Sequence, residues 1–295
     1  MPIDRHAATS RPVLHRQWRP AARLRLRFGF AWRCALLMPA LALAQPAHDS
    51  PPAAPATAAA SVQPAAAASA VPAPRGPAGG AFSSAHPAGP LPPGWHNLPV
   101  VKGKRLTHYT LVDDGGNTVI QADADGSASA LLRHGDIDLA QTPAVSWRWK
   151  VAAPITGADN HLSAQEDAPA RLVFFFDGDR SKLTFGQRVQ MHLAQGLAGM
   201  ELPYATLMYI WSESAPPGAV IANPLTSRVQ MIVVSGGSAE AGRWLQFQRD
   251  IVRDYEQVFH EKPGKLIAYG LLTDTDNTGT TARAWYGDLH FQPEH

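Results

Sequence analysis

The chain has 295 residues, with 26 basic residues, 24 acidic residues and one cysteine. Residues 1–44 hold eight arginines and one acid, Asp4, so the remainder has 18 basic and 23 acidic residues and a net charge of about −5. Proteins bind nucleic acid through a basic surface that contacts the phosphates. Because the remainder of this chain is acidic, we do not expect nucleic acid as a partner.

Residues 1–44 are predicted to be a cleaved signal peptide. An arginine-rich stretch precedes an apolar run at 34–43, and Ala42-Leu43-Ala44 fits the small-residue cleavage pattern. The run is about ten residues long, whereas a membrane-spanning helix needs about 20, so we expect no transmembrane anchor after cleavage. Cys34 lies inside this run, so the mature chain would contain no cysteine. The expected location is the periplasm or the extracellular space.

Residues 45–93 are predicted to form a disordered tether. Alanine and proline dominate this segment, and it has too few aromatic or branched apolar residues to offset the entropy of ordering. The tether is either a spacer that holds a domain away from the envelope or a passive insertion. The folded domain is therefore expected at 94–295.

From residue 94 onwards, short runs of branched and aromatic residues alternate with turn-forming residues, which indicates a β-rich domain. Residues Ala144–Val151 alternate apolar and polar positions, as in a strand with one dry face. Two other runs, 172–176 and 207–211, are apolar on both faces and fit central strands. The predicted strands are 107–112, 118–122, 128–133, 144–151, 171–176, 205–211, 228–234, 244–248, 266–272 and 282–291.

Two short helices are predicted. Thr184 and Gln187 match a capping box, and Val189, Leu193 and Leu197 follow at helical spacing before a glycine. The second helix covers about 250–259 and carries an apolar stripe. Many strands with two helices favour an all-β fold, a β-sandwich or jelly roll, over alternating β/α units.

Five segments resemble an uncharacterised family of bacterial secreted domains, a domain of unknown function. The resemblance covers roughly 100–291 and implies a galactose-binding-like jelly roll, similar to carbohydrate-binding modules, with no established ligand. Such modules often end in an aromatic-Asp-Asp pattern, in which Gly287 here replaces the first acid. The segments are Trp147-Arg-Trp-Lys150, Asp167-Ala-Pro-Ala-Arg171, 203–211, 273–279 and Ala284-Trp-Tyr-Gly-Asp288.

The strongest candidate site is the loop with Asp274, Asp276 and Asn277, which follows an apolar strand. Carboxylate and amide oxygens suit calcium, so Asp274 and Asp276 are the candidate metal ligands, although the spacing does not complete an EF-hand. The same loop could bind a sugar by hydrogen bonds. Capping of a tight turn by these side chains is the structural alternative.

Arg171 opens a predicted buried strand, and a buried guanidinium needs a carboxylate partner. Asp159, Asp167 or Asp274 could supply it, and we favour a structural pair between Asp167 and Arg171 over a ligand-facing one. Sugar rings stack on exposed aromatic faces, and Trp211 and Trp285 are the tryptophans nearest to predicted strand ends.

Three functions remain open from the sequence. The first is a non-catalytic module that binds an envelope or extracellular polysaccharide. The second is a structural protein that binds another envelope protein. The third is a carbohydrate-active hydrolase that uses Asp167 and Asp274 as its paired carboxylates, because glycoside hydrolysis needs two acids across a groove. The sequence contains no recognised nucleophile elbow, zinc helix or phosphate loop.

Overall fold

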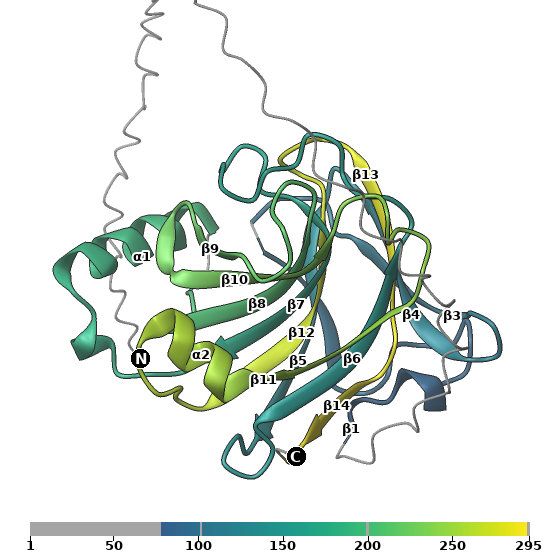
Figure 1. Cartoon of the computed structure of the whole chain (residues 1–295), viewed down its shortest axis with the longest axis horizontal. Helices are drawn as coiled ribbons and strands as arrows, with labels where there is room; N and C mark the ends of the chain where they lie inside the picture. Colours follow the sequence, from purple (N-terminus) through teal and green to yellow (C-terminus); the bar gives the residue numbers. More distant parts are fainter. Residues whose placement is uncertain (1–77, 101, 199–200, 294–295) are drawn as a thin grey trace, which may run out of the picture. The chain divides into compact units, whose positions relative to one another are not determined.

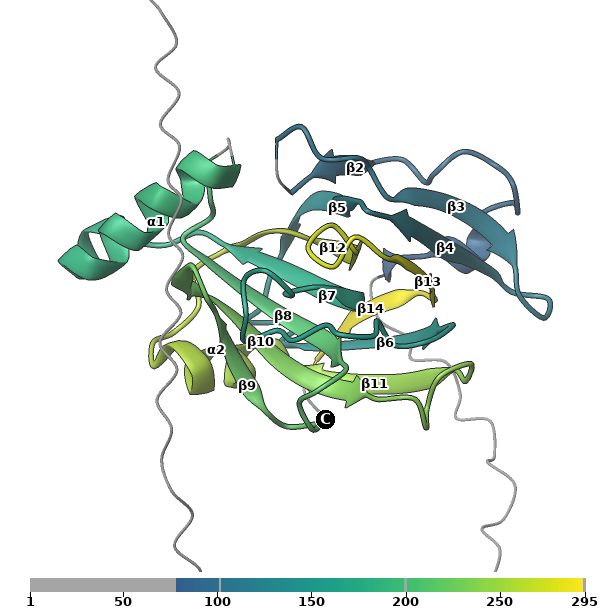
Figure 2. The same ribbon diagram turned by 90° about the horizontal axis from the view of Figure 1, so that it is seen from above.

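The computed structural model describes residues 78–100, 102–198 and 201–293. The predicted signal peptide and most of the predicted tether lie outside these residues. Figures 1 and 2 show a sandwich of two curved sheets, with both helices at one end and β3 and β4 at the other. The predicted all-β sandwich with two helices is confirmed. Neither described α-helix has the length and apolar character that a membrane crossing requires.

The first sheet is centred on β6. The strand β11 pairs with one edge of β6, while β14 and β13 share the other edge. From β13 the sheet continues to β4 and β3, and β1 extends it beside β14. Its strands are β1 (Ala78–Gly80), β3 (His108–Asp113), β4 (Thr118–Asp125), β6 (Ala144–Val151), β11 (Leu245–Asp250), β13 (Thr281–Tyr286) and β14 (Leu289–Gln292).

The second sheet has the order β2-β5-β12-β7-β8-β10-β9. The two runs predicted as central strands became β7 and β8, which lie inside this sheet, and β8 pairs in parallel with β10. Its strands are β2 (Trp95–Pro99), β5 (Ala128–Ile137), β7 (Ala168–Phe176), β8 (Ala205–Ser212), β9 (Val220–Asn223), β10 (Thr226–Gly236) and β12 (Leu266–Asp274).

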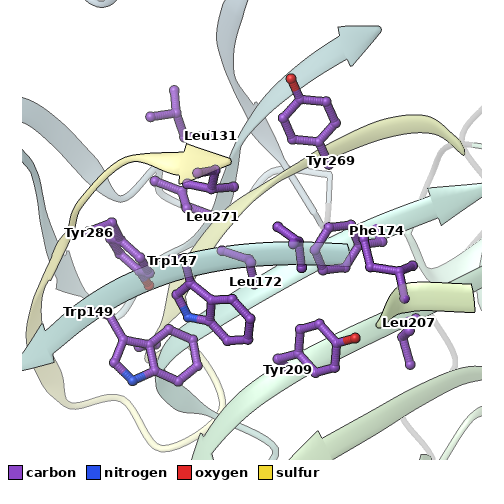
Figure 3. Close-up of a cluster of buried hydrophobic side chains, with 14 of the residues drawn as sticks. Leu131, Trp147, Trp149, Leu172, Phe174, Leu207, Tyr209, Tyr269, Leu271 and Tyr286 are labelled. Atoms are coloured by element: carbon purple, nitrogen blue, oxygen red, sulfur yellow. The ribbon is translucent and has the colours of Figure 1, made fainter. Parts of the chain in front are cut away.

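The core between the sheets is rich in aromatic rings, as Figure 3 shows. The alternation of β6 places Trp147 and Trp149 on its buried face. The Trp147 ring stacks on Tyr209 of β8 at 5.1 Å, and Tyr209 meets Phe174 of β7 edge to face at 5.6 Å. Aromatic pairs of this geometry add to the stabilisation that comes from area burial alone. The opposite face of β6 is left for polar residues.

The two α-helices differ in how well their apolar stripes are buried. Helix α1 (Phe185–Ala198) has the predicted capping box, in which Thr184 and Gln187 exchange backbone-to-side-chain hydrogen bonds. Its predicted stripe is not core, since Val189 is 42% and Leu193 63% exposed, and Met191 is buried instead. Helix α2 (Ile251–Phe259) forms where it was predicted and buries Ile251 and Tyr255 of its apolar stripe. The Asp250 side chain caps it by accepting a hydrogen bond from the backbone N–H of Arg253.

The predicted strand at 282–291 is two strands, β13 and β14. Both pair with β6, but at different ends of it, and the turn at Gly287 separates them. A Cβ at Gly287 would lie 2.6 Å from Cγ of Arg148, so a side chain at this turn would displace that arginine. Close packing therefore requires a glycine at this turn, and the apolar pattern of the segment does not reveal it.

Residues 78–93, which we assigned to the tether, belong to the packed domain. Strand β1 pairs with β14, and a 3₁₀ turn follows at Phe82–Ser84. Phe82 is fully buried and packs on Trp95 with 5.0 Å between ring centroids. The Asp288 carboxylate stabilises the turn at Phe82–Ser84 by accepting hydrogen bonds from the backbone N–H and the hydroxyl of Ser83. A second 3₁₀ turn, Arg180–Lys182, precedes α1.

Candidate functional site

Most of the predicted polar residues meet where β7 begins and β12 ends. These strands are antiparallel neighbours, and their register places Asp274 opposite Ala168 and Leu272 opposite Arg171. The loop before β7 and the loop after β12 therefore leave the sheet side by side. The residues that this brings together are Glu166, Asp167, Arg171, Asp274, Asp276 and Asn277, which we call the Arg171 cluster.

Arg171 is the centre of the cluster and is 1% exposed. Its Nε and Nη2 donate to the two carboxylate oxygens of Asp274, each at 3.1 Å. Its Nη1 donates to Oε1 of Glu166 at 3.0 Å, and its Nη2 also reaches the Glu166 carbonyl at 2.8 Å. A bidentate carboxylate and a second acid thus satisfy the buried guanidinium.

Asp167 does not pair with Arg171, which corrects our expectation for these two residues. Its carboxylate accepts hydrogen bonds from the backbone N–H of Asn277 at 3.2 Å and of Thr278 at 2.7 Å, and from the Thr278 hydroxyl at 2.6 Å. The loop amides are nearer to Asp167 than the guanidinium is, so Asp167 holds the loop after β12 and Glu166 takes the predicted role.

Burial controls the acid–base properties of this cluster. Desolvation raises the pKa of Asp274 to about 7, although the adjacent Arg171 charge acts in the opposite direction. Burial also raises the pKa of Glu166. It lowers the pKa of Arg171, but the charges of Asp274 and Glu166 outweigh that effect and raise it overall. The arginine therefore stays charged while its acids hold protons more tightly than they would in water.

A cation fits this cluster poorly. One carboxylate oxygen from each of Asp167, Asp274 and Asp276 lies within 4.8 Å of the others. However, Asp274 already binds the Arg171 guanidinium, Asp167 accepts three hydrogen bonds, and Asp276 pairs with Lys104 at 3.0 Å. Calcium wants six to eight oxygen ligands, whereas here the positive charge is supplied by side chains.

We therefore expect calcium to have little effect on stability. The midpoint of thermal unfolding of the full chain should differ by less than about 1 °C between calcium and EDTA, because a ligand stabilises only a site that it occupies. A calcium-dependent rise of several degrees, lost in Asp276→Asn, would instead show that the carboxylates release their present partners for the ion.

The same hydrogen bonds leave Asp167 and Asp274, the predicted pair of catalytic acids, inaccessible to a substrate. Asp167 and Asp274 are 1% and 6% exposed, and their oxygens are bonded to the protein. A glycosidase needs its two acids on opposite sides of an open groove that admits the sugar. The Arg171 cluster therefore has a structural role, which is to hold the loop before β7 and the loop after β12 together.

The predicted residues Asp159 and Trp211 lie elsewhere. Asp159 is at the surface, where its carboxylate binds the backbone N–H and ring nitrogen of His161, both at 3.0 Å, and its pKa is lowered mainly by these bonds. Trp211 is fully buried between the sheets. It has no exposed face on which a sugar ring could stack.

Trp285 belongs to a separate surface on the outer face of the β6 sheet. Register places Trp285 of β13 between Lys150 of β6 and Gln121 of β4. On the other side of β6, Leu245 pairs with Trp149, so the preceding residue, Trp244, lies next to Lys150. The Lys150 ammonium is 4.5 Å from the Trp285 ring centroid and 5.2 Å from that of Trp244.

Both indole rings are held by their N–H groups. The Trp285 Nε1 donates to Oε1 of Gln121 at 2.9 Å. The Trp244 Nε1 donates to Oδ2 of Asp114 at 2.6 Å, and the same carboxylate accepts two hydrogen bonds from Lys150, each at 2.9 Å. We call Trp244, Lys150, Trp285, Gln121 and Asp114 the tryptophan platform. Its rings are partly exposed and fixed in orientation.

The family model described as protein of unknown function, DUF3047, matches residues 93–290. The chain belongs to this family. Among curated proteins none matches. Among solved structures, endoglucanase 3 of family GH12 from Trichoderma harzianum is similar over 70% of this chain and 100% of its own, with 8% identity and a TM-score of 0.35.

The DUF3047 match spans both the Arg171 cluster and the tryptophan platform. The sequence predicted Trp285 as a sugar-stacking residue, but it did not single out Trp244, Lys150, Gln121 or Asp114. The alternation of 144–151 had placed Lys150 on the wet face of its strand, so it could have been found from that pattern. Trp244 and Gln121 depend on which strands flank β6, and that pairing is not visible in the sequence.

Proposed function

We propose that this DUF3047 protein is an exported, non-catalytic β-sandwich that binds a glycan on the tryptophan platform. The observation that carries the proposal is the pair of partly exposed indoles, Trp244 and Trp285, on either side of Lys150. Sugar rings stack on aromatic faces while their hydroxyls bond to amide and charged groups. The platform offers both kinds of partner on one sheet face.

Fixed rings favour this function over loose surface packing. A side chain that is ordered before binding loses less conformational entropy when the ligand arrives. Here the Gln121 amide and the Asp114 carboxylate hold the indoles by their N–H groups. Strands lie about 4.8 Å apart, so the backbones of Trp244 and Trp285 are about 10 Å apart across β6. Both rings lie within 5.2 Å of the Lys150 ammonium, so they form one continuous surface.

Two sequence features support an exported role for such a module. The N-terminal segment has the composition of a secretory signal, and the Ala/Pro-rich segment that follows has that of a tether. A polysaccharide of the envelope or of the medium is the partner that this arrangement would reach.

The proposal is tested by titrating the full chain, without its signal segment, with cellohexaose, xylohexaose, chitohexaose and hexagalacturonate. We expect saturable quenching of tryptophan fluorescence by one class, together with a higher unfolding midpoint, since a ligand that binds the native state stabilises it. Failure of all four classes to bind at millimolar concentration would contradict the proposal. A higher unfolding midpoint without quenching of tryptophan fluorescence would place the ligand away from the platform.

A further inference from the structure

A positively charged residue, Arg148, lies beside the tryptophan platform and indicates which class of glycan would bind there. Arg148 lies one position along the outer face of β6 from Lys150, opposite Gln246 of β11. Its guanidinium carbon is 4.5 Å from the Trp244 ring centroid, and its side chain passes over Gly287 within the space that a Cβ would fill. Arg148 thus lies beside both Trp244 and Gly287.

Among the cations named on this face, Arg148 is the one that has no direct ion-pair partner in the described residues. Lys150 is bound to Asp114, and Arg283, the next outer residue along β13 from Trp285, is bound to Asp123. Within the residues that the structure describes, Arg148 has no carboxylate within ion-pair distance. Among the residues named here, Arg148, Lys150 and Arg283 therefore outnumber Asp114 and Asp123 by one charge.

We infer that the platform recognises an acidic glycan, one with a carboxylate on a sugar ring, and that Arg148 binds this carboxylate. The inference rests on the proposed function and names its ligand class. A guanidinium presents a planar pair of N–H groups that matches a carboxylate in two parallel hydrogen bonds. Stacked on Trp244, Arg148 can offer this edge to a sugar whose ring lies on the neighbouring indole.

The alternative for Arg148 is a stabilising cation–π contact without a ligand. Such a contact explains the position of the guanidinium over Trp244, and it would be indifferent to the charge of any sugar. The two interpretations therefore differ in one measurable quantity, which is the preference for an acidic sugar over its neutral counterpart.

The test compares hexagalacturonate with its methyl ester, which keeps the sugar backbone and removes the charge. Calorimetric titration of the full chain should give about tenfold tighter binding of the acid, with a preference that weakens as salt rises because exposed charges are screened. Arg148→Gln should remove the preference while the ester binds as before. Arg148→Lys should restore part of it, since lysine keeps the charge without the planar edge.

Arg283→Gln is the matched control, because it removes one positive charge from the same face but from a residue already paired with Asp123. It should keep the acid preference within about twofold.

Equal binding of acid and ester by the unaltered protein would overturn the inference and leave the proposed function standing. An acid preference that survives in Arg148→Gln would overturn the role of Arg148. Binding of neutral hexasaccharides but of neither galacturonate would also overturn the inference, whereas binding of no glycan would overturn the proposed function itself.

Discussion

Replacing Asp274 by alanine is expected to lower the free energy of unfolding by about 3–5 kcal/mol, because it leaves the buried Arg171 without its bidentate partner. For a domain of this size the corresponding fall in the unfolding midpoint is roughly 10 °C. Chemical denaturation of the full chain, followed by tryptophan fluorescence, measures the loss. The loss should be measured at about pH 5 and about pH 8, on either side of the pKa of about 7 that burial gives Asp274, and it should be larger at the lower pH.

The pH dependence of this loss has a defined sign. The folded-state pKa of Asp274 lies above its ordinary value of 3.8, so the carboxyl stabilises the fold fully below pH 3.8 and loses this contribution as pH rises through about 7. Asp276→Ala is the matched control, since its partner Lys104 is 42% exposed and a pair of that kind contributes at most about 1 kcal/mol. If the two variants lost equal free energy of unfolding, the Arg171 cluster would not have the structural role described here.

The second large effect is expected from the double variant Trp244→Ala/Trp285→Ala. Aromatic residues at the centre of a binding surface cost about 2 kcal/mol or more each on truncation, so the affinity for the glycan that binds the unaltered protein should fall by nearly a thousandfold. The unfolding midpoint should change little, because both rings lie outside the core between the sheets. Calorimetric titration with that glycan measures the loss.

Gln246→Ala provides the control for the double variant. Gln246 is exposed on β11 opposite Arg148 and bonds to neither indole, so its loss should leave the affinity within about twofold. A double variant that binds as tightly as the unaltered protein would remove the tryptophan platform from consideration. Binding would then have to occur on another face.

Local patterns predicted the elements whose residues interact with near neighbours in the chain. The alternation of 144–151 defined β6 with its bounds, and the Thr184 and Gln187 pair located the start of α1. Strand β1 could not be predicted, because Ala78–Gly80 has no apolar signal and is ordered by pairing with β14 far along the chain. The same holds for the stripe of α1, whose burial depends on what the fold places against it.

The candidate sites follow the same division. The sequence showed that the buried Arg171 needs an acid, and it included Asp274 among the three candidates. It could not show that Glu166 rather than Asp167 completes the pairing, because adjacent residues in a loop differ only in the direction of their side chains. The tryptophan platform joins residues from β4, β6, β13 and the start of β11, so it exists only once the strand order is known.

The pairing of β1 with β14 brings the two ends of the described domain close together. Chain entry at Ala78 and chain exit after Gln292 are hydrogen-bonded neighbours at one sheet edge, with Ala78 opposite His290. Anchoring the domain through either terminus would therefore suspend it from the same corner and in the same orientation. A pulling force applied through the two ends together would unzip this strand pair first, before the load reached the sheets that hold the core.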